Sequence, residues 1–467
     1  MASGLGFGGY RISTGVAEHR VALEEGLRSG VNLIDTSANY ADGGSERLIG
    51  EVLGALMEEG AIRRDETVVV SKGGYIQGGN MEHARAQRES GEGFPDVVEL
   101  GRDLWHSISP EFLHDQIARS RARLGLQQID LYLLHNPEYY LTWAERQELP
   151  AEVARAEYER RLGAAFDHLE REVIDGRIGW YGVSSNTFPA PRGAYNATHL
   201  DRLVAIAEAI RPDHHFSVVQ FPANLLERGF VAEPHDSTGR TLVEVAQRAG
   251  LGTLANRPLN AIVNNELMRL ADFPAAAQEE SDVIEKMVEE LEGEERRFVL
   301  EELERFADDP EGKRALREFL SVGSTMERYR DTFGSIEQYN DVLSHHFAPR
   351  LAWTARYFSE RGTEDLAEWY AGYLERARQL LDAVGAGYAG AAQKRSDALR
   401  ELIDAAMETQ NEGSLSQLAV RLLWGAGVDA VLVGMRRPSY VEDMLGALQS
   451  GPLGTVETWR GLAPRLL

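Results

Sequence analysis

Four residues of this chain combine types and spacing that could perform acid–base chemistry on a substrate. Asp35, Lys72 and His135 each stand at the end of a short apolar run, and Tyr40 follows Asp35 by five residues. Runs this apolar are typical of strands buried on both faces of a parallel sheet. Because the carboxyl ends of parallel strands meet at one edge, we expect the four side chains to share one site.

Each of these residues alone also has an ordinary structural explanation. An Asp after a strand often caps the next helix, and a Lys that closes a strand usually points to solvent. A His before Asn-Pro is more often packed than catalytic, and a loop Tyr mostly packs. The chemical interpretation therefore depends on the combination.

The elements that must position these residues alternate between short β-rich runs and longer amphipathic segments. Such alternation, repeated about eight times, predicts a (β/α)8 TIM barrel. The glycines near residue 6 do not form a GxGxxG fingerprint before a helix, which favours a barrel over a Rossmann fold. The expected strands are Leu5–Gly8, Val31–Ile34, Thr67–Val70, Ile129–Leu134, Gly179–Val183, Val218–Gln220, Gly252–Ala255 and Ala430–Val433. The expected helices are Glu18–Ser29, Ser45–Met57, Pro110–Leu124, Tyr158–Ile174, Leu200–Ile210, Thr241–Ala249 and Ser414–Trp424.

Three stretches exceed what a minimal barrel needs. The segments Gly73–Ser109 and Pro137–Arg155 are long connections after the third and fourth strands. Residues 260–412 form a larger acidic block between the seventh strand and its helix, and loops of this length are rarely structureless. We expect a barrel at 1–259 and 413–467, interrupted by a helical insertion that could act as a lid or an oligomer interface.

Composition narrows the class of protein further. The 467 residues contain no Cys, which excludes disulfides, thiolate nucleophiles and Cys-ligated zinc. The net charge of -25 argues against a nucleic-acid partner. Neither a signal-peptide pattern nor a long apolar span is visible. We therefore expect a cytoplasmic protein with a small-molecule substrate and no membrane partner, which could form a homo-oligomer.

The four-residue combination closely resembles the aldo/keto reductase family. Leu33–Tyr40 is similar to the signature around its Asp and Tyr, and Ser71-Lys72 and Leu133–Pro137 match its Lys and His motifs. The resemblance covers roughly residues 4–260 and 413–449, and it does not cover the insertion. It implies an oxidoreductase that transfers hydride between a nicotinamide cofactor and an aldehyde, ketone or sugar.

The resemblance also implies a role for each catalytic residue. Tyr40 would donate a proton to the carbonyl oxygen, and the Lys72 ammonium would stabilise the phenolate and lower its pKa. Asp35 would hold Lys72, and His135 would orient the carbonyl. This chemistry requires no metal.

Other matches to the family place the cofactor. Arg436 and Arg437 stand before a helix, where guanidinium groups suit a 2′-phosphate, so we favour NADP over NAD. Asn256 stands where an aromatic residue often stacks on the nicotinamide, and Tyr440 and Met444 replace usual polar contacts to adenosine. The implied cofactor residues are Gly8, Gly9, Tyr10, Asp35, Ser185, Asn186, Gln220, Asn256, Arg257, Leu259, Gly434, Met435, Arg436, Arg437, Tyr440 and Asp443.

The substrate and the direction of reaction stay open. Tyr139, Tyr140 and Trp143 have the spacing of a hydrophobic or sugar-stacking wall, and equally of residues that pack a helical turn on the barrel. Trp105 and His106 could line the other side of the substrate site. Two alternative functions also stay open: redox-neutral sugar epimerisation with a retained cofactor, and a cofactor-binding regulatory protein.

Overall fold

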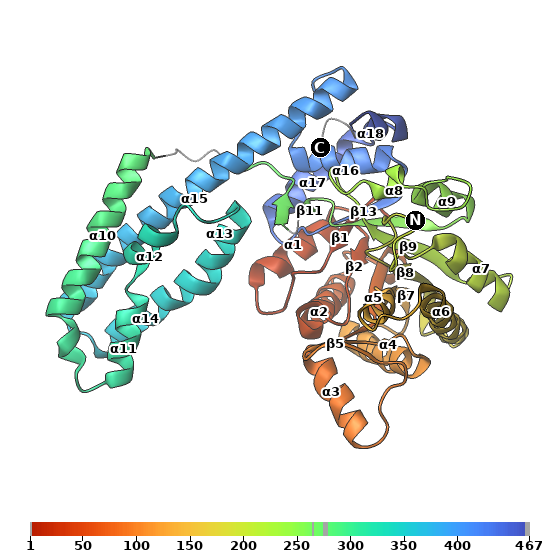
Figure 1. Ribbon diagram of the computed structural model, residues 1–467, viewed down its shortest axis with the longest axis horizontal. Helices are drawn as coiled ribbons and strands as arrows, with labels where there is room; N and C mark the ends of the chain where they lie inside the picture. The colour runs from red at the N-terminus through yellow and green to blue at the C-terminus, as the bar shows by residue number, and fades with distance from the viewer. Residues whose placement is uncertain (1, 264–265, 274–278, 463–467) are drawn as a thin grey trace. The chain divides into compact units, whose positions relative to one another are not determined.

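The computed structural model describes residues 2–263, 266–273 and 279–462, and its central feature is a closed barrel (Figure 1). Within this described part, eight parallel strands close in the order β1-β13-β10-β9-β8-β7-β3-β2. The predicted (β/α)8 barrel is thereby confirmed. Its strands are β1 (Leu5–Gly8), β2 (Leu33–Asp35), β3 (Val68–Gly73), β7 (Ile129–His135), β8 (Ile178–Ser184), β9 (Phe216–Pro222), β10 (Gly252–Asn256) and β13 (Ala430–Val433).

The barrel interior is filled by side chains from alternate positions of the strands. Successive side chains of a strand point to opposite faces, so every second residue turns inward. The inward residues form one buried apolar cluster: Leu33, Val70, Leu133, Val218, Leu254, Ala430 and Leu432.

A helix follows each strand on the outside of the barrel. Ser109 caps the helix after β3 by accepting from the Phe112 amide, as the preference for Ser at N-caps predicts. Gly30, at φ 92°, terminates the first helix in a backbone conformation that favours glycine. The outer helices are α1 (Ala17–Arg28), α2 (Gly44–Glu58), α4 (Pro110–Leu124), α6 (Ala151–Ile174), α7 (Leu200–Ile210), α9 (Leu242–Arg248), α16 (Leu415–Gly425) and α17 (Pro438–Ser450).

The two long connections contain more regular structure than the sequence indicates. The segment after β3 forms α3 (Gly78–Glu89) and a sheet of β4 (Tyr75–Ile76), β6 (Leu104–His106) and β5 (Val98–Gly101). The segment after β7 forms α5 (Tyr139–Arg146), and α6 then begins at Ala151 rather than at Tyr158. Of its first seven residues, three are charged and three are alanines, so this stretch carries little of the apolar periodicity that marks a helix in sequence.

The insertion after β10 begins with β11 (Asn260–Val263) and β12 (Glu266–Arg269), and most of its remaining described residues lie in helices. Its buried residues form a hydrophobic core of their own. The chain packs as two compact units, 1–263 with 402–467, and 264–401. The expected limits were 259/260 and 412/413, and the last helix of the insertion, which runs to Met407, crosses the boundary between the units at 401/402. The helices are α10 (Ser281–Glu301), α11 (Pro310–Phe319), α12 (Val322–Tyr329), α13 (Ile336–Val342), α14 (Ala348–Arg361) and α15 (Glu364–Met407).

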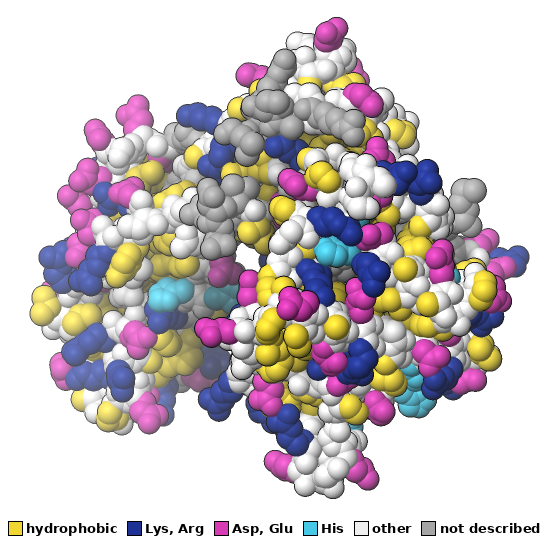
Figure 2. Space-filling model, turned by 45° about the vertical axis from the view of Figure 1, so that its right-hand side comes forward, with side chains coloured by type: hydrophobic (Ala, Val, Ile, Leu, Met, Phe, Trp, Pro, Cys, Tyr) yellow, Lys and Arg dark blue, Asp and Glu magenta, His cyan; other side chains and the backbone are white. Residues whose placement is uncertain are grey.

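The surface mixes both signs of charge. On the face drawn in Figure 2, Lys and Arg side chains are interspersed with Asp and Glu. Many charged side chains of the described residues form ion pairs, for example Arg160 with Asp96 at 2.7 Å. Among the described residues, no helix has the length and apolar character to cross a membrane.

Candidate active site

The polar residues of the site occupy inward positions near the carboxyl ends of five of the eight barrel strands. Each stands two positions after a residue of the interior cluster, so the period of two turns it toward the barrel axis at the carboxyl end. This placement brings together side chains from distant parts of the chain. The pairs are Leu33 and Asp35, Val70 and Lys72, Leu133 and His135, Val218 and Gln220, and Leu254 and Asn256.

Lys72 is the centre of the site. Its side chain is fully buried, and its ammonium nitrogen lies 2.7 Å from Asp35 Oδ2, 2.9 Å from the Thr36 carbonyl and 3.2 Å from the Tyr40 hydroxyl. Burial lowers the pKa of Lys72. Asp35 and Tyr40 together raise the pKa by more than burial lowers it, so the net shift is upward. Lys72 is therefore a charged donor at neutral pH.

Tyr40 lies within reach of Lys72 and of His135. The pKa of Tyr40 is raised, because burial raises it more than the Lys72 charge and hydrogen bond lower it. Lys72 thus acts in the expected direction, but the expected net decrease is wrong, and the cause is the burial of the phenol. Tyr40 is a protonated donor at neutral pH.

His135 lies beside Tyr40, with ring centroids 5.9 Å apart. Its Nδ1 is 3.0 Å from the Ser37 hydroxyl. Burial lowers the pKa of His135 well below its ordinary value, and the nearby Lys72 charge lowers it further. His135 is therefore a neutral imidazole that can offer one N–H to a ligand.

A chain of amide groups continues the site from Asp35. Gln220 donates to Asp35 Oδ1 at 2.8 Å, and its own oxygen accepts from Ser184 at 2.9 Å and from Asn256 at 3.3 Å. Asn256 Oδ1 is buried and has no hydrogen-bond partner. A buried acceptor without a partner is costly, and an amide N–H of a bound ligand would satisfy it.

Backbone geometry is unusual directly after three of the site residues. Ala41, Asn136 and Arg257 all adopt positive φ angles, of 48°, 51° and 54°, and they follow Tyr40, His135 and Asn256. Left-handed backbone at a residue other than glycine costs about 1–3 kcal/mol. Such strain clusters at functional sites, where the surrounding structure holds it in place.

Two glycines at the end of the first strand allow other parts of the chain to approach its backbone closely. A Cβ atom on Gly9 would lie 2.7 Å from the Ser45 hydroxyl and 2.8 Å from the Asp35 carbonyl. A Cβ atom on Gly8 would lie 3.2 Å from the Val433 carbonyl. Close approach of backbone therefore requires glycine at both positions.

Tyr10, which is 64% exposed, lies beside Tyr40 at the same strand end. The two ring centroids are 5.1 Å apart, and the rings meet edge to face.

Ser185 and Asn186 lie at the end of β8, where Glu138 supports them. Glu138 is buried, and its Oε1 accepts from the Asn186 amide at 2.8 Å. Burial raises the pKa of Glu138 to about 7, although neighbouring donors lower it in part. The Ser185 hydroxyl donates to Thr198 at 2.9 Å. Backbone and side chains of this turn are thereby fixed before any ligand binds.

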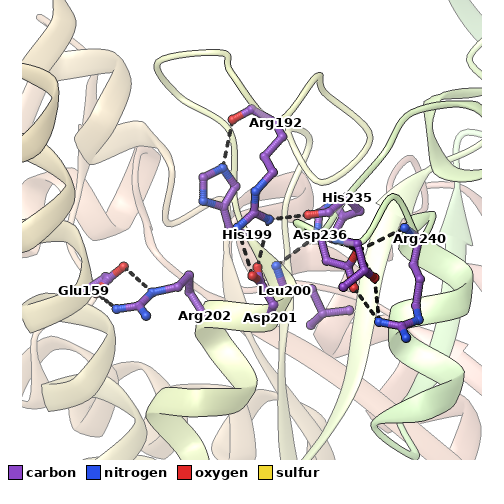
Figure 3. Close-up of polar contacts among 10 residues, drawn as sticks. Glu159, Arg192, His199, Leu200, Asp201, Arg202, His235, Asp236 and Arg240 are labelled. Carbon is purple, nitrogen blue, oxygen red and sulfur yellow. Dashed lines mark hydrogen bonds and ion pairs between the residues drawn. The ribbon is translucent and has the colours of Figure 1, made fainter.

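The loops after β8 and β9 are joined by a polar network (Figure 3). His235 Nε2 accepts from the Leu200 amide, the first residue of α7, at 2.9 Å. Arg192 binds both oxygens of Asp201, at 3.1 and 2.9 Å. It also donates to the His235 carbonyl. The network fixes the segment that follows Ser185 and Asn186.

The remaining cofactor candidates lie after β10 and β13. Arg257 contacts Glu227 at 2.7 Å, and Leu259 and Met435 are buried. Arg437 is about half exposed and lies 3.6 Å from Glu18. The predicted contacts Gly434, Arg436, Arg437 and Tyr440 stand before or in the first turn of α17. Asp443 accepts from Ser414 at 2.8 Å and from Gln417 at 3.0 Å, which ties α17 to α16.

Of the four substrate candidates, Tyr139 alone joins the ring cluster around His135. Its ring lies 5.2 Å from that of Tyr75, which in turn lies 4.6 Å from His135. Tyr140 packs on Trp143 at 6.0 Å and beneath Arg161 at 4.2 Å. Trp105 belongs to a separate apolar cluster with Ile76, Met81, Ala84 and Phe112, and Arg88 lies over its ring at 4.4 Å.

Sequence reasoning suggested His106 as a lining residue of the substrate site, and it missed Tyr75 and Glu138. Tyr75 receives a hydrogen bond from Asn136 at 2.7 Å, and His106 Nε2 donates to the His135 carbonyl at 2.8 Å. Burial lowers the pKa of His106 to about 4. Tyr75 follows Lys72 by three residues, much as Tyr40 follows Asp35 by five. A tyrosine shortly after an ionisable residue at a strand end is a sequence signal that could have identified it. Nothing in sequence marks Glu138, because its role depends on the turn after β8.

This architecture and this Asp-Tyr-Lys-His arrangement define a class of protein. The family model described as "Aldo/keto reductase family" matches residues 4–263, and the chain belongs to this family.

Curated relatives match over part of their length. The chain is 28% identical over 190 residues to "NADH-specific methylglyoxal reductase" of Escherichia coli (strain K12), covering 38% of this chain and 53% of that protein. It is 28% identical over 182 residues to "D-threo-aldose 1-dehydrogenase" of Pseudomonas sp, which covers 39% of this chain and 48% of that protein. The chain thus spans about half the length of the curated relatives it matches.

Solved structures are also similar. A glycerol dehydrogenase from Gluconobacter oxydans is 16% identical, with 99% of this chain and 91% of that chain covered, at a TM-score of 0.47. An aldo/keto reductase from Klebsiella pneumoniae, solved with NADP and acetate, is 22% identical, with 55% and 65% covered, at a TM-score of 0.34.

Proposed function

We propose that this chain is an NADP(H)-dependent oxidoreductase that interconverts a carbonyl and an alcohol of a small substrate. The observation that carries the proposal is the position of Lys72, whose ammonium contacts both Asp35 and the Tyr40 hydroxyl. This is the arrangement needed to move a proton on and off a phenol beside a reacting carbonyl.

When bound, the nicotinamide cofactor supplies or accepts the hydride. In the reductive direction, Tyr40 gives its hydroxyl proton to the carbonyl oxygen of the substrate. The phenolate that remains is stabilised by the Lys72 charge at 3.2 Å, and Asp35 holds Lys72 in place. In the oxidative direction, the same phenolate recovers the proton from the alcohol.

His135 orients the carbonyl. Its Nδ1 lies 3.0 Å from the Ser37 hydroxyl, and the neutral tautomer with its proton on Nε2 can donate to the carbonyl oxygen. A neutral donor stabilises the developing negative charge without competing with Tyr40 as the acid.

The strand ends and the first turn of α17 fit the two ends of the cofactor. Asn256 Oδ1, buried without a partner, and the turn at Ser185 and Asn186 suit the nicotinamide carboxamide. Arg436 and Arg437 suit a 2′-phosphate, which supports NADP. The name of the Escherichia coli relative specifies NADH, so NAD is the second candidate.

The substrate we propose is a small aldehyde, ketone or sugar. The rings of Tyr75 and Tyr139 beside His135 provide an aromatic wall of the kind that stacks on sugars. The names of the relatives, a methylglyoxal reductase and an aldose dehydrogenase, support this class. We further propose a cytoplasmic location, no nucleic-acid partner and a homo-oligomeric state.

A Tyr40→Phe variant tests the proposal directly. The variant should lose at least 100-fold in kcat for carbonyl reduction, because it lacks the acid, yet still quench NADPH fluorescence on binding. A Tyr329→Phe variant, at an exposed tyrosine of the insertion, serves as the matched control. Turnover that survives in Tyr40→Phe would show that another group is the acid.

A substrate panel separates the alternatives. Incubation with NADP and sugars, hydroxysteroids or simple alcohols should change the absorbance of reduced nicotinamide for at least one class. No change with any of them would favour the regulatory function. Cofactor that stays bound through purification would favour the redox-neutral one.

A further inference from the structure

Two histidines and a glutamate meet on the outer ring of barrel helices, apart from the catalytic residues. His114 lies in the second turn of α4, and His168 and Glu172 lie one turn apart on α6. Residues at i and i+4 share one face of a helix, so both α6 side chains point toward α4. The three ligand atoms all lie within 4.8 Å of one another.

The distances between these atoms approach those of a coordinated metal. His114 Nδ1 lies 2.9 Å and His168 Nε2 lies 3.1 Å from the same Glu172 oxygen, Oε1. A tetrahedral zinc ion with bonds of about 2.0–2.1 Å separates its ligand atoms by about 3.3 Å. Small side-chain rotations would therefore admit the ion between them.

The contact of His168 is not explained by hydrogen bonding. Its Nε2 is buried and has no hydrogen-bond partner, although Glu172 Oε1 is close. A buried ring nitrogen without a partner costs free energy unless another group satisfies it. Coordination of a metal ion would satisfy it.

The carboxylate of Glu172 is held in an orientation that suits a metal ligand. It is fully buried, and Arg177 donates to its other oxygen, Oε2, which leaves Oε1 facing the histidines.

We propose that His114, His168 and Glu172 form a binding site for a divalent transition metal, with Zn²⁺ as the best fit. Two imidazole nitrogens and one carboxylate oxygen are ligands that zinc accepts, and water would complete the tetrahedron. The His114 side chain is 57% exposed, so the ion can enter from solvent. Since it would bridge α4 and α6, the site serves stability rather than the hydride chemistry.

Calorimetric titration of the full-length, chelator-treated protein with Zn²⁺ tests the site. The wild type should show one saturable site, and His114→Asn and Glu172→Gln should each weaken that binding by at least tenfold. His114 is well exposed, so its replacement should not disturb folding. The control is His345→Asn, which removes an exposed histidine beside Asp341 in the insertion.

Thermal unfolding provides a second measurement. An ion that binds only the folded protein raises the unfolding temperature, so saturating Zn²⁺ should raise it in the wild type and in His345→Asn. The same addition should have little effect on His114→Asn or Glu172→Gln. Equal binding by all four proteins, or no saturable binding by the wild type, would overturn the proposal.

Discussion

At the scale of single residues, Glu138 couples the site to pH. Its carboxyl group lies beneath the Asn186 amide and is buried, with one oxygen that has no hydrogen-bond partner. Burial raises the pKa of Glu138 from 4.5 to about 7. Between these two values, the folded protein holds a proton that the unfolded chain releases. Glu138 therefore makes the folded state less stable as the pH rises from about 4.5 to about 7.

A Glu138→Gln variant should remove this dependence. Gln keeps the shape and the acceptor but carries no charge, so its stability relative to the wild type should increase with pH. Between pH 5 and pH 8 the relative gain is up to about 3 kcal/mol. Urea unfolding of both proteins at the two pH values measures the difference in their free energies of unfolding. The contributions of other titrating groups are the same in both proteins and cancel in this difference. A constant difference between the two proteins would mean that Glu138 is ionised throughout.

The catalytic residues could be predicted from sequence because their positions follow from strand periodicity. Lys72 and His135 end short apolar runs, so their strands and their place at the barrel mouth are both encoded locally. Trp105 shows the limit of this reasoning. Its distance from the site depends on how β6 pairs with β4 and β5, and no local pattern states which face of that small sheet it occupies.

At the scale of elements, the turns after β8 and β9 stabilise each other through His235. Its Nε2 accepts from the amide of Leu200, one of the α7 donors that the helix itself cannot satisfy (Figure 3). Burial lowers the pKa of His235 to about 4, so the ring stays neutral and keeps its acceptor in the folded protein. The unfolded chain protonates His235 below about pH 6.5. Stability is therefore lost as the pH falls from about 6.5 to about 4.

A His235→Phe variant should lose about 1–3 kcal/mol of unfolding free energy at pH 8, because a buried amide loses its acceptor. The loss should be smaller at pH 5, where the wild type also bears the cost of keeping His235 neutral. Urea unfolding at both pH values checks this, with His345→Phe as an exposed control. A loss that is equal at both pH values would contradict the neutral state of His235.

Most barrel elements could be predicted, and the exceptions have a common cause. The helices Pro110–Leu124 and Leu200–Ile210 match the predicted limits. Ser109 and Gly125 mark the two ends of the first helix, and Pro212 follows the end of the second. The strands β4, β5 and β6 were not predicted. They are two to four residues long and lie among glycines, so they carry too few side chains for a period to appear.

At the scale of the whole molecule, each of the two compact units has a hydrophobic core of its own among its described residues. The interior of the barrel is one, and the other lies among the helices of the insertion, where Phe298 stacks on Trp369 at 4.6 Å. Arg376 of α15 also binds both oxygens of Glu294 on α10, at 2.9 and 2.6 Å. Because each unit buries its own apolar surface, we expect each to unfold as its own cooperative transition.

Core substitutions in each unit test this expectation. Leu380 is fully buried in the core of the insertion, and Leu380→Ala should cost about 2–5 kcal/mol there. Scanning calorimetry should show two transitions in the wild type, with Leu380→Ala lowering the temperature of one. Ile117→Ala, at a fully buried position of α4, should lower only the other. A single transition that both variants shift together would instead show that α15, which continues into the barrel unit, couples the two cores.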